Sequence, residues 1–159
     1  MLPLCCESSK NRDMENKEIL FREKAETYLV CFNGACPRHE QCLRWQVGQR
    51  IDPRKRIVTS VSPFYAPAAE GHCDEYRDAR PIRMPLGMKN HFYEEMPART
   101  AYNIKNALIA HNCRATYYKY HNGKLPITPE YEALIRQTCR RYGWTQPLVF
   151  DGEVVDYVW

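Results

Sequence analysis

Four cysteines in the first half of the chain constrain its fold more than any other feature. The stretch CFNGACPRHEQC carries three thiols within twelve residues, and a fourth follows in GHCDEY; they are Cys31, Cys36, Cys42 and Cys73. Residues 33–85 hold six of the eleven prolines and few periodic segments. So long a stretch with so little regular structure is uncommon in a folded domain unless something besides an apolar core ties it down.

A metal ion held by the four cysteines would supply that tie. Thiolates are soft, charged ligands that tolerate burial when a cation neutralises them, and structural zinc takes four ligands in a tetrahedron. The sequence therefore predicts a zinc site, in which His39 or His72 could replace one thiol because each lies close to a cysteine. Two alternatives stay open: an iron–sulfur cluster, which also uses four cysteines, and buried thiols without a metal.

The cellular compartment expected from the sequence favours free thiols over disulfides. The N-terminal segment MLPLCCESSK has no basic region and few apolar residues, so it is not a secretory signal, and Met14 is a second candidate start. No apolar run approaches the roughly 18–20 residues that span a bilayer. We therefore expect a cytoplasmic protein without a membrane partner, in which disulfides are disfavoured.

The periodicity divides the chain into three parts with a mainly α (α+β) fold. Residues 1–27 are a lead, unstructured to residue 13, followed by a short helix from Glu15. Residues 28–85 form the irregular cysteine-rich lobe, with short strands at YLVCF and RIVTSVS and a helical turn or two after Pro37, closed by Gly48. Residues 86–159 form a helical lobe.

The helical lobe carries the clearest local signals. A helix is expected from Pro97 to Asn112, and a second from Arg114 to Asn122. A third has Thr128 as its N-cap, Pro129 as its first residue, and an inward stripe that ends with Gly143. Its expected inward residues are Tyr131, Leu134, Ile135, Thr138, Cys139 and Tyr142. Asp151-Gly152 between two apolar runs predicts a C-terminal β-hairpin.

Basic residues are concentrated in this lobe. Between residues 97 and 145 there are eight basic and two acidic residues, a local charge of +6 in a chain whose net charge is +4. A surface of this kind is typical of proteins that bind polyanions. A solvated helix face would give the same count.

The stretch NALIAHNCRATYYKYHNGKLPITPE resembles the middle of lambda-repressor-like helix-turn-helix domains. The resemblance implies that Arg114, Thr116, Tyr117 and Lys119 lie near a nucleic-acid groove, and Lys124 near phosphate. The whole chain also resembles an uncharacterised bacterial family of small proteins with CFN-x-x-CP…CLR near the start and TYY…NGK-x-P…YGW near the end. That family carries no assigned activity.

These observations predict a small zinc-stabilised binding protein, associated with DNA or RNA. One alternative is a protein–protein adaptor, whose interface would be formed by Tyr117, Tyr118, Tyr120 and Trp144. Another is an iron–sulfur or thiol redox protein. No nucleophile and base can be paired from the sequence, so an enzyme is not the expectation.

Overall fold

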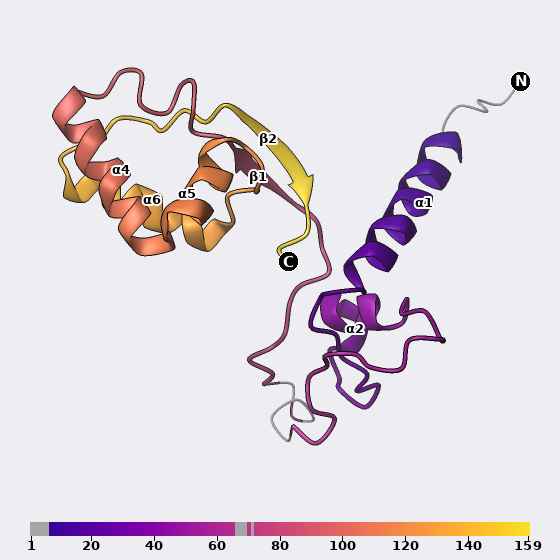
Figure 1. Cartoon of the computed structure of the whole chain (residues 1–159). Coiled ribbons are helices and arrows are strands. Elements are labelled where there is room, and N and C mark those ends of the chain that lie inside the picture. Colours follow the sequence, from indigo (N-terminus) through magenta and orange to yellow (C-terminus); the bar gives the residue numbers. More distant parts are fainter. Residues whose placement is uncertain (1–6, 66–69, 71) are drawn as a thin grey trace, which may run out of the picture. The chain divides into compact units, whose positions relative to one another are not determined.

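The computed structural model describes residues 7–65, 70 and 72–159, with side chains from residue 16 onward. These residues contain five α-helices, a 3-10 helix and a two-stranded antiparallel sheet, a mixed α+β fold. The chain divides into two units: the cysteine unit, up to Arg80 together with Trp159, and the helical unit, residues 81–158 (Figure 1). Within the described residues, no helix combines the length and apolar character needed to cross a membrane.

Helix α1 (Glu7–Lys24) is longer than the sequence analysis predicted. Residues 7–13, expected to be unstructured, form its first turns, while residues 1–6 of the expected lead lie outside the described residues. The segment contains neither glycine nor proline and is rich in glutamate, lysine and arginine, which favour helix. Further along, the carboxylate of Glu18 accepts hydrogen bonds from the Arg50 guanidinium at 2.7–3.1 Å.

The two strands predicted in the cysteine-rich lobe are not formed. Their segments meet only at a single parallel bridge between Val30 and Ser60. In this bridge the N–H of Val30 donates to Thr59 at 3.1 Å and its carbonyl accepts the N–H of Val61 at 2.8 Å, while the next N–H, that of Cys31, points to the other side and donates to the carbonyl of Arg44 at 3.1 Å. The expected helical turns after Pro37 are present as a 3-10 helix, η1 (His39–Gln41), and helix α2 (Leu43–Gly48).

A small apolar core lies beside α2 in the cysteine unit. Its fully buried members are Phe21, Val30, Leu43 and Val47. The indole of Trp159 packs edge-on against Phe21 and Tyr28, with ring centroids 5.8 and 5.4 Å apart. The C-terminal end of the described chain therefore contributes to the unit that contains the N-terminal helix.

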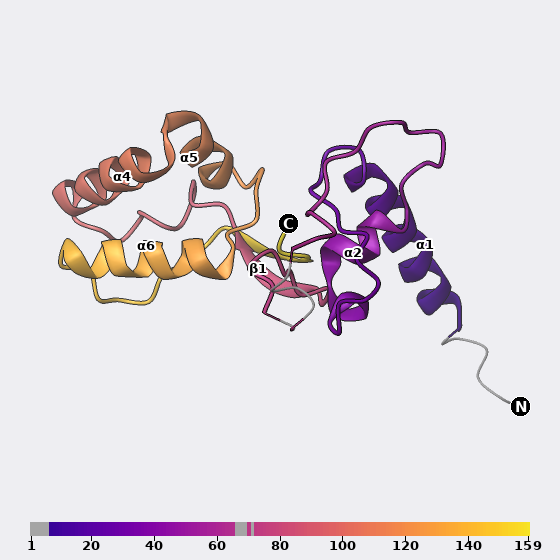
Figure 2. The same cartoon turned by 90° about the horizontal axis from the view of Figure 1, so that it is seen from below.

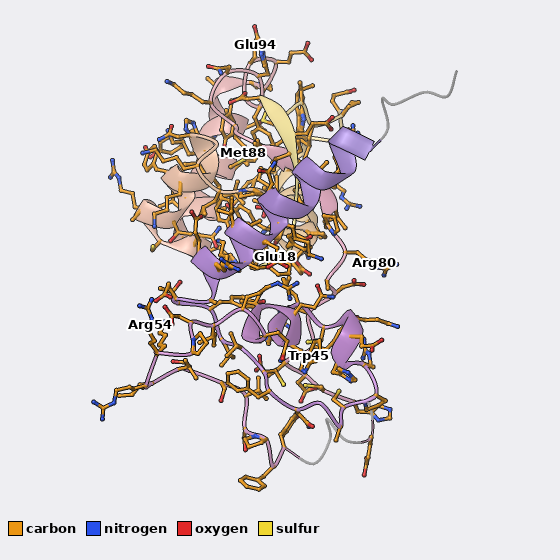
Figure 3. All side chains as sticks on the ribbon, turned by 90° about the vertical axis from the view of Figure 1, so that its right-hand side faces the viewer. Glu18, Trp45, Arg54, Arg80, Met88 and Glu94 are labelled. Atoms are coloured by element: carbon orange, nitrogen blue, oxygen red, sulfur yellow. The ribbon has the colours of Figure 1, made fainter. Side chains whose placement is uncertain are left out.

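Three helices build the helical unit: α4 (Ala98–Asn112), α5 (Arg114–His121) and α6 (Pro129–Arg141). Helix α4 packs against both of the others (Figure 2). The fully buried core residues include Met88, Ile104, Leu108, Tyr117, Ile127 and Ile135, and Met88 is labelled in Figure 3. Pro97 precedes α4 instead of opening it, and Cys113, at a φ of 61°, separates α4 from α5.

Helix α6 follows its prediction closely. The hydroxyl of Thr128 accepts the N–H of Tyr131 at 3.3 Å, which is the expected N-cap, and Pro129 is the first helical residue. Tyr131, Ile135 and Cys139 are buried, and Gly143 ends the helix at a φ of +82°. Local sequence signals were sufficient to predict α6, because its N-cap, its first-turn proline and its apolar periodicity all indicate the same helix.

The predicted C-terminal hairpin is wrong. Strand β2 (Gly152–Asp156) pairs antiparallel with β1 (Ile82–Leu86), in a register that places Met84 opposite Val154. Asp151 makes no turn between two strands; its carboxylate accepts the N–H groups of Lys89, Asn90 and His91 at 2.7–3.0 Å. Asp151 therefore caps the segment that follows β1, and its own N–H donates to the carbonyl of Gly87 in the same region.

Candidate functional site

Backbone hydrogen bonds bring three separate stretches of the cysteine unit together. The N–H of Cys31 donates to the carbonyl of Arg44 at 3.1 Å. The N–H of Leu43 donates to Arg77 at 2.7 Å, and that of Ala79 donates to Gln41 at 3.0 Å. The segments that carry the first, third and fourth cysteines are therefore held side by side, although thirty residues separate Cys42 from Cys73.

All four predicted cysteines line one small cavity in this region. Cys42 is buried and the other three are half-buried. The cavity has a volume of about 20 Å³ and is also lined by His39, Arg44 and Trp45; Figure 3 labels Trp45 on α2. His72, the other histidine considered from the sequence, is exposed and is not among the described lining residues.

The four cysteines share one cavity, but their thiols are not arranged around a common point. The six described cysteines are all free. Across the described side chains, no group of three or more histidine, cysteine or acidic residues is placed so that it could hold a metal ion. Burial raises the pKa of the Cys31 thiol, the Asn33 N–H lowers it, and the other three cysteines raise it further. Neighbouring thiolates would repel one another, so their ionisation together requires a cation.

The imidazole of His39 is fixed in one tautomer. Its Nδ1 lies 2.7 Å from the carbonyl oxygen of Cys36. A carbonyl can only accept, so Nδ1 carries a proton, and in the neutral ring the lone pair is therefore on Nε2. The ring also packs edge-on against Trp45, with centroids 4.6 Å apart.

Arg44 is the buried polar group of the site, 7 % exposed. Its guanidinium donates to the carbonyls of Leu29 and Glu75 at 2.9 and 2.7 Å and to the Glu75 carboxylate at 2.8 Å. The side chain therefore fastens the segment before Cys31 to the segment after Cys73. Sequence analysis missed this role, and a lone arginine between apolar residues offers no local signal for it.

The second predicted site, on α5 and in the turn that follows it, is only partly at the surface. Arg114, Lys119 and Lys124 are exposed, and Thr116 is half-buried. Tyr117 is 0 % exposed and its hydroxyl lies 3.0 Å from that of Tyr93, so its assignment to a groove-facing surface is wrong. At this point of α5 the side chain faces the core. No ion pair found among the described residues involves any of the three exposed cations.

The tyrosines considered for a protein interface lie mostly inward. Tyr118 and Tyr120 are half-buried and pack against the core of the helical unit, as does Trp144. The Tyr118 ring has Lys105 and Arg114 near it, at 5.5 and 5.8 Å from its centroid. The outer side of α5 is therefore more cationic than aromatic.

Comparison with known proteins identifies a family whose function is unknown. The model of DUF6078, a family of unknown function, matches residues 14–159. No curated protein and no solved structure matches the chain.

Proposed function

Because the chain belongs to this family of unknown function, its role has to be argued from its own residues, and we propose that it is a small binding protein stabilised by zinc. The zinc would be structural and held at the cavity lined by Cys31, Cys36, Cys42 and Cys73. The convergence of these four thiols from distant segments is the observation that carries the proposal. It meets the chemical need for soft, anionic ligands.

The size of the cavity favours a single ion over a cluster. About 20 Å³ is close to the space that one water molecule needs. An iron–sulfur cluster consists of several iron and sulfide atoms, so it would require the segments around the cavity to separate.

The architecture of the cysteine unit explains why zinc would stabilise it. Between residues 25 and 80 the described regular elements are only η1 and α2. Long loops of this kind lose much conformational entropy on folding. Metal binding supplies free energy that is coupled to folding, because the unfolded chain has no preformed site.

Metal content of the purified protein tests the proposal directly. We expect one zinc per chain in wild type, and loss of zinc in Cys31→Ser and Cys73→Ser. Cys113→Ser is the matched control, because Cys113 is exposed in the helical unit. Hydrogen exchange after chelation should show loss of protection in the cysteine unit while α4 and α6 remain protected. Wild-type protein that binds no stoichiometric metal, with both variants folding normally, refutes the proposal.

For the helical unit we propose a second role, contact with DNA or RNA. Arg114, Lys119 and Lys124 favour it, because they are exposed, form no ion pair among the described residues, and are of the types that commonly contact phosphates. Three phosphate contacts give a slope of about −2.7 in log K against log salt for duplex DNA, or a loss of about 40-fold between 50 and 200 mM.

Variants of single cations test the nucleic-acid proposal. Lys124→Ala should reduce the magnitude of the salt slope by about one. Lys55→Ala is the control, because Lys55 already pairs with Glu26 at 2.8 Å in the cysteine unit. Binding that is insensitive to salt, or equal effects of the two variants, would contradict this role and favour the protein adaptor.

A further inference from the structure

The cavity is lined by more metal-binding side chains than zinc needs. Besides the four cysteines, His39 and Glu75 line it. The Glu75 carboxylate is already paired with Arg44 at 2.8 Å, which leaves five candidate ligands around a space suited to one ion. Structural zinc is almost always four-coordinate. One of these five side chains would therefore not coordinate the metal. The geometry of His39 indicates which of them that is.

His39 has the arrangement of a prepared zinc ligand. Its Nδ1–H donates to the Cys36 carbonyl at 2.7 Å, which fixes the tautomer and leaves Nε2 free. Metal-bound histidines almost always have such a partner on the other nitrogen. Contact with Trp45 at 4.6 Å further limits the ring. The hydrogen bond and the ring contact already restrict the His39 side chain before a metal binds, so metal binding would lose less side-chain conformational entropy.

The cysteines differ in how firmly the backbone holds them. Cys31 is bonded to Arg44 through its N–H, and its sulfur accepts the Asn33 N–H at 3.5 Å. Cys42 is buried and forms a β-bridge with Asp78. The bonds of the Cys36 backbone are local: its N–H donates to Asn33 at 3.3 Å, and its carbonyl accepts from His39, three residues later in the same turn. Exchange of Cys36 for His39 therefore needs the least movement of the chain.

We infer that zinc is held by Cys31, Cys42, Cys73 and the Nε2 of His39, and that Cys36 remains a free thiol beside the metal. This inference rests on the proposed zinc site. A free thiol at Cys36 would make the site open to regulation, because an electrophile or oxidant could modify Cys36 while the metal stays bound. An imidazole in place of one thiolate also reduces the negative charge of the partly buried site by one.

Alkylation of the zinc-loaded protein tests this assignment. With iodoacetamide, the Cys36 thiolate displaces iodide and forms a thioether, and its proton passes to solvent. We expect peptide mapping to find Cys36 alkylated and Cys31, Cys42 and Cys73 protected, with one zinc per chain retained. In Cys36→Ser we expect zinc content equal to that of wild type, unlike Cys31→Ser.

A histidine variant provides the independent measurement. His39→Asn keeps an amide N–H where Nδ1 donates to Cys36 but removes the Nε2 ligand, and His72→Asn is the exposed control. With cobalt as the probe, we expect the visible absorption bands of His39→Asn to shift and its metal affinity to fall at least tenfold, while His72→Asn matches wild type.

The outcomes separate the two proposals. If wild type binds zinc but Cys36 is protected and His39→Asn has an unchanged cobalt spectrum, the histidine assignment is overturned and a four-cysteine site stands. If wild type binds no zinc or cobalt, the proposed function itself fails. Circular dichroism of each metal-free and loaded variant distinguishes loss of a ligand from loss of the fold.

Discussion

Replacement of Asp151 is expected to destabilise the helical unit more than substitution of a partly exposed residue usually does. Its carboxylate accepts three backbone N–H groups, from Lys89 at 2.7 Å and from Asn90 and His91 at 3.0 Å. These bonds fix the segment that follows β1, just before the buried Phe92. The Asp151 N–H also donates to the Gly87 carbonyl at 3.2 Å, so the contact has a backbone and a side-chain part.

The magnitude follows from the number of bonds and their exposure. Hydrogen bonds to a charged group contribute about 1.5–3 kcal/mol each when they are well shielded. Water can reach the three N–H groups here, so about 1 kcal/mol apiece is the better figure, and Asp151→Ala should lower the free energy of unfolding by about 2–4 kcal/mol. Asp151→Asn keeps Oδ1, which accepts two of the bonds, and places an amide donor against the third. Its cost should be about 1–2 kcal/mol.

Hydrogen exchange of the slowest amides in α4 and α6 measures this loss, because these helices surround the core of the helical unit. Glu153→Gln is the matched control: it removes a negative charge two residues away, from an exposed pair with Arg83 that should contribute less than about 1 kcal/mol. If Asp151→Ala costs no more than Glu153→Gln, the carboxylate is not the structural cap described here.

The pH dependence of Asp151 provides a second check on the same contact. Burial opposes ionisation, but the three backbone donors outweigh it, so the pKa of Asp151 is lowered in the folded protein. A lowered pKa means that the contribution is complete above the unfolded value of about 3.9 and is lost as the pH falls through the folded value. Below about pH 4, wild type should therefore approach the stability of Asp151→Asn.

Two further substitutions test packing and capping. Gly48→Ala places a Cβ 2.6 Å from the backbone carbonyl oxygen of Cys31, so it should lower the free energy of unfolding by about 1–3 kcal/mol and weaken zinc binding. In the control variant Gly34→Ala the new Cβ meets nothing within 4 Å, so the zinc content should not change. Thermal unfolding together with metal analysis compares the two variants. Thr128→Ala removes the N-cap of α6 and should cost about 1 kcal/mol in chemical denaturation, while Thr128→Ser should retain most of it; equal losses would argue against the cap.

The elements that the sequence predicted well are those whose signals are local. Helix α6 has its cap, its proline and its apolar stripe within one segment, and all three were confirmed. Asp151-Gly152 shows the opposite case. The dipeptide favours a hairpin locally, but the strand that pairs with residues 152–156 lies some seventy residues earlier, and that partner determines the outcome.

The candidate site shows the same limit. Cys31, Cys36, Cys42 and Cys73 could be grouped from residue type alone, and they do line one cavity. The burial of Tyr117 could not be predicted, because three tyrosines in four positions of a short helix carry no sign of which one faces inward. The roles of Arg44 and of the His39 tautomer depend on carbonyls that only the folded chain brings near them.

The position of Trp159 in the cysteine unit has a consequence for folding during synthesis. Domains generally fold as units as the chain leaves the ribosome, with N-terminal ones first. Phe21 and Tyr28 emerge early, but the indole that packs against both of them emerges only after the entire helical unit. The cysteine unit must therefore wait, with part of its apolar surface uncovered, until translation has passed residue 159.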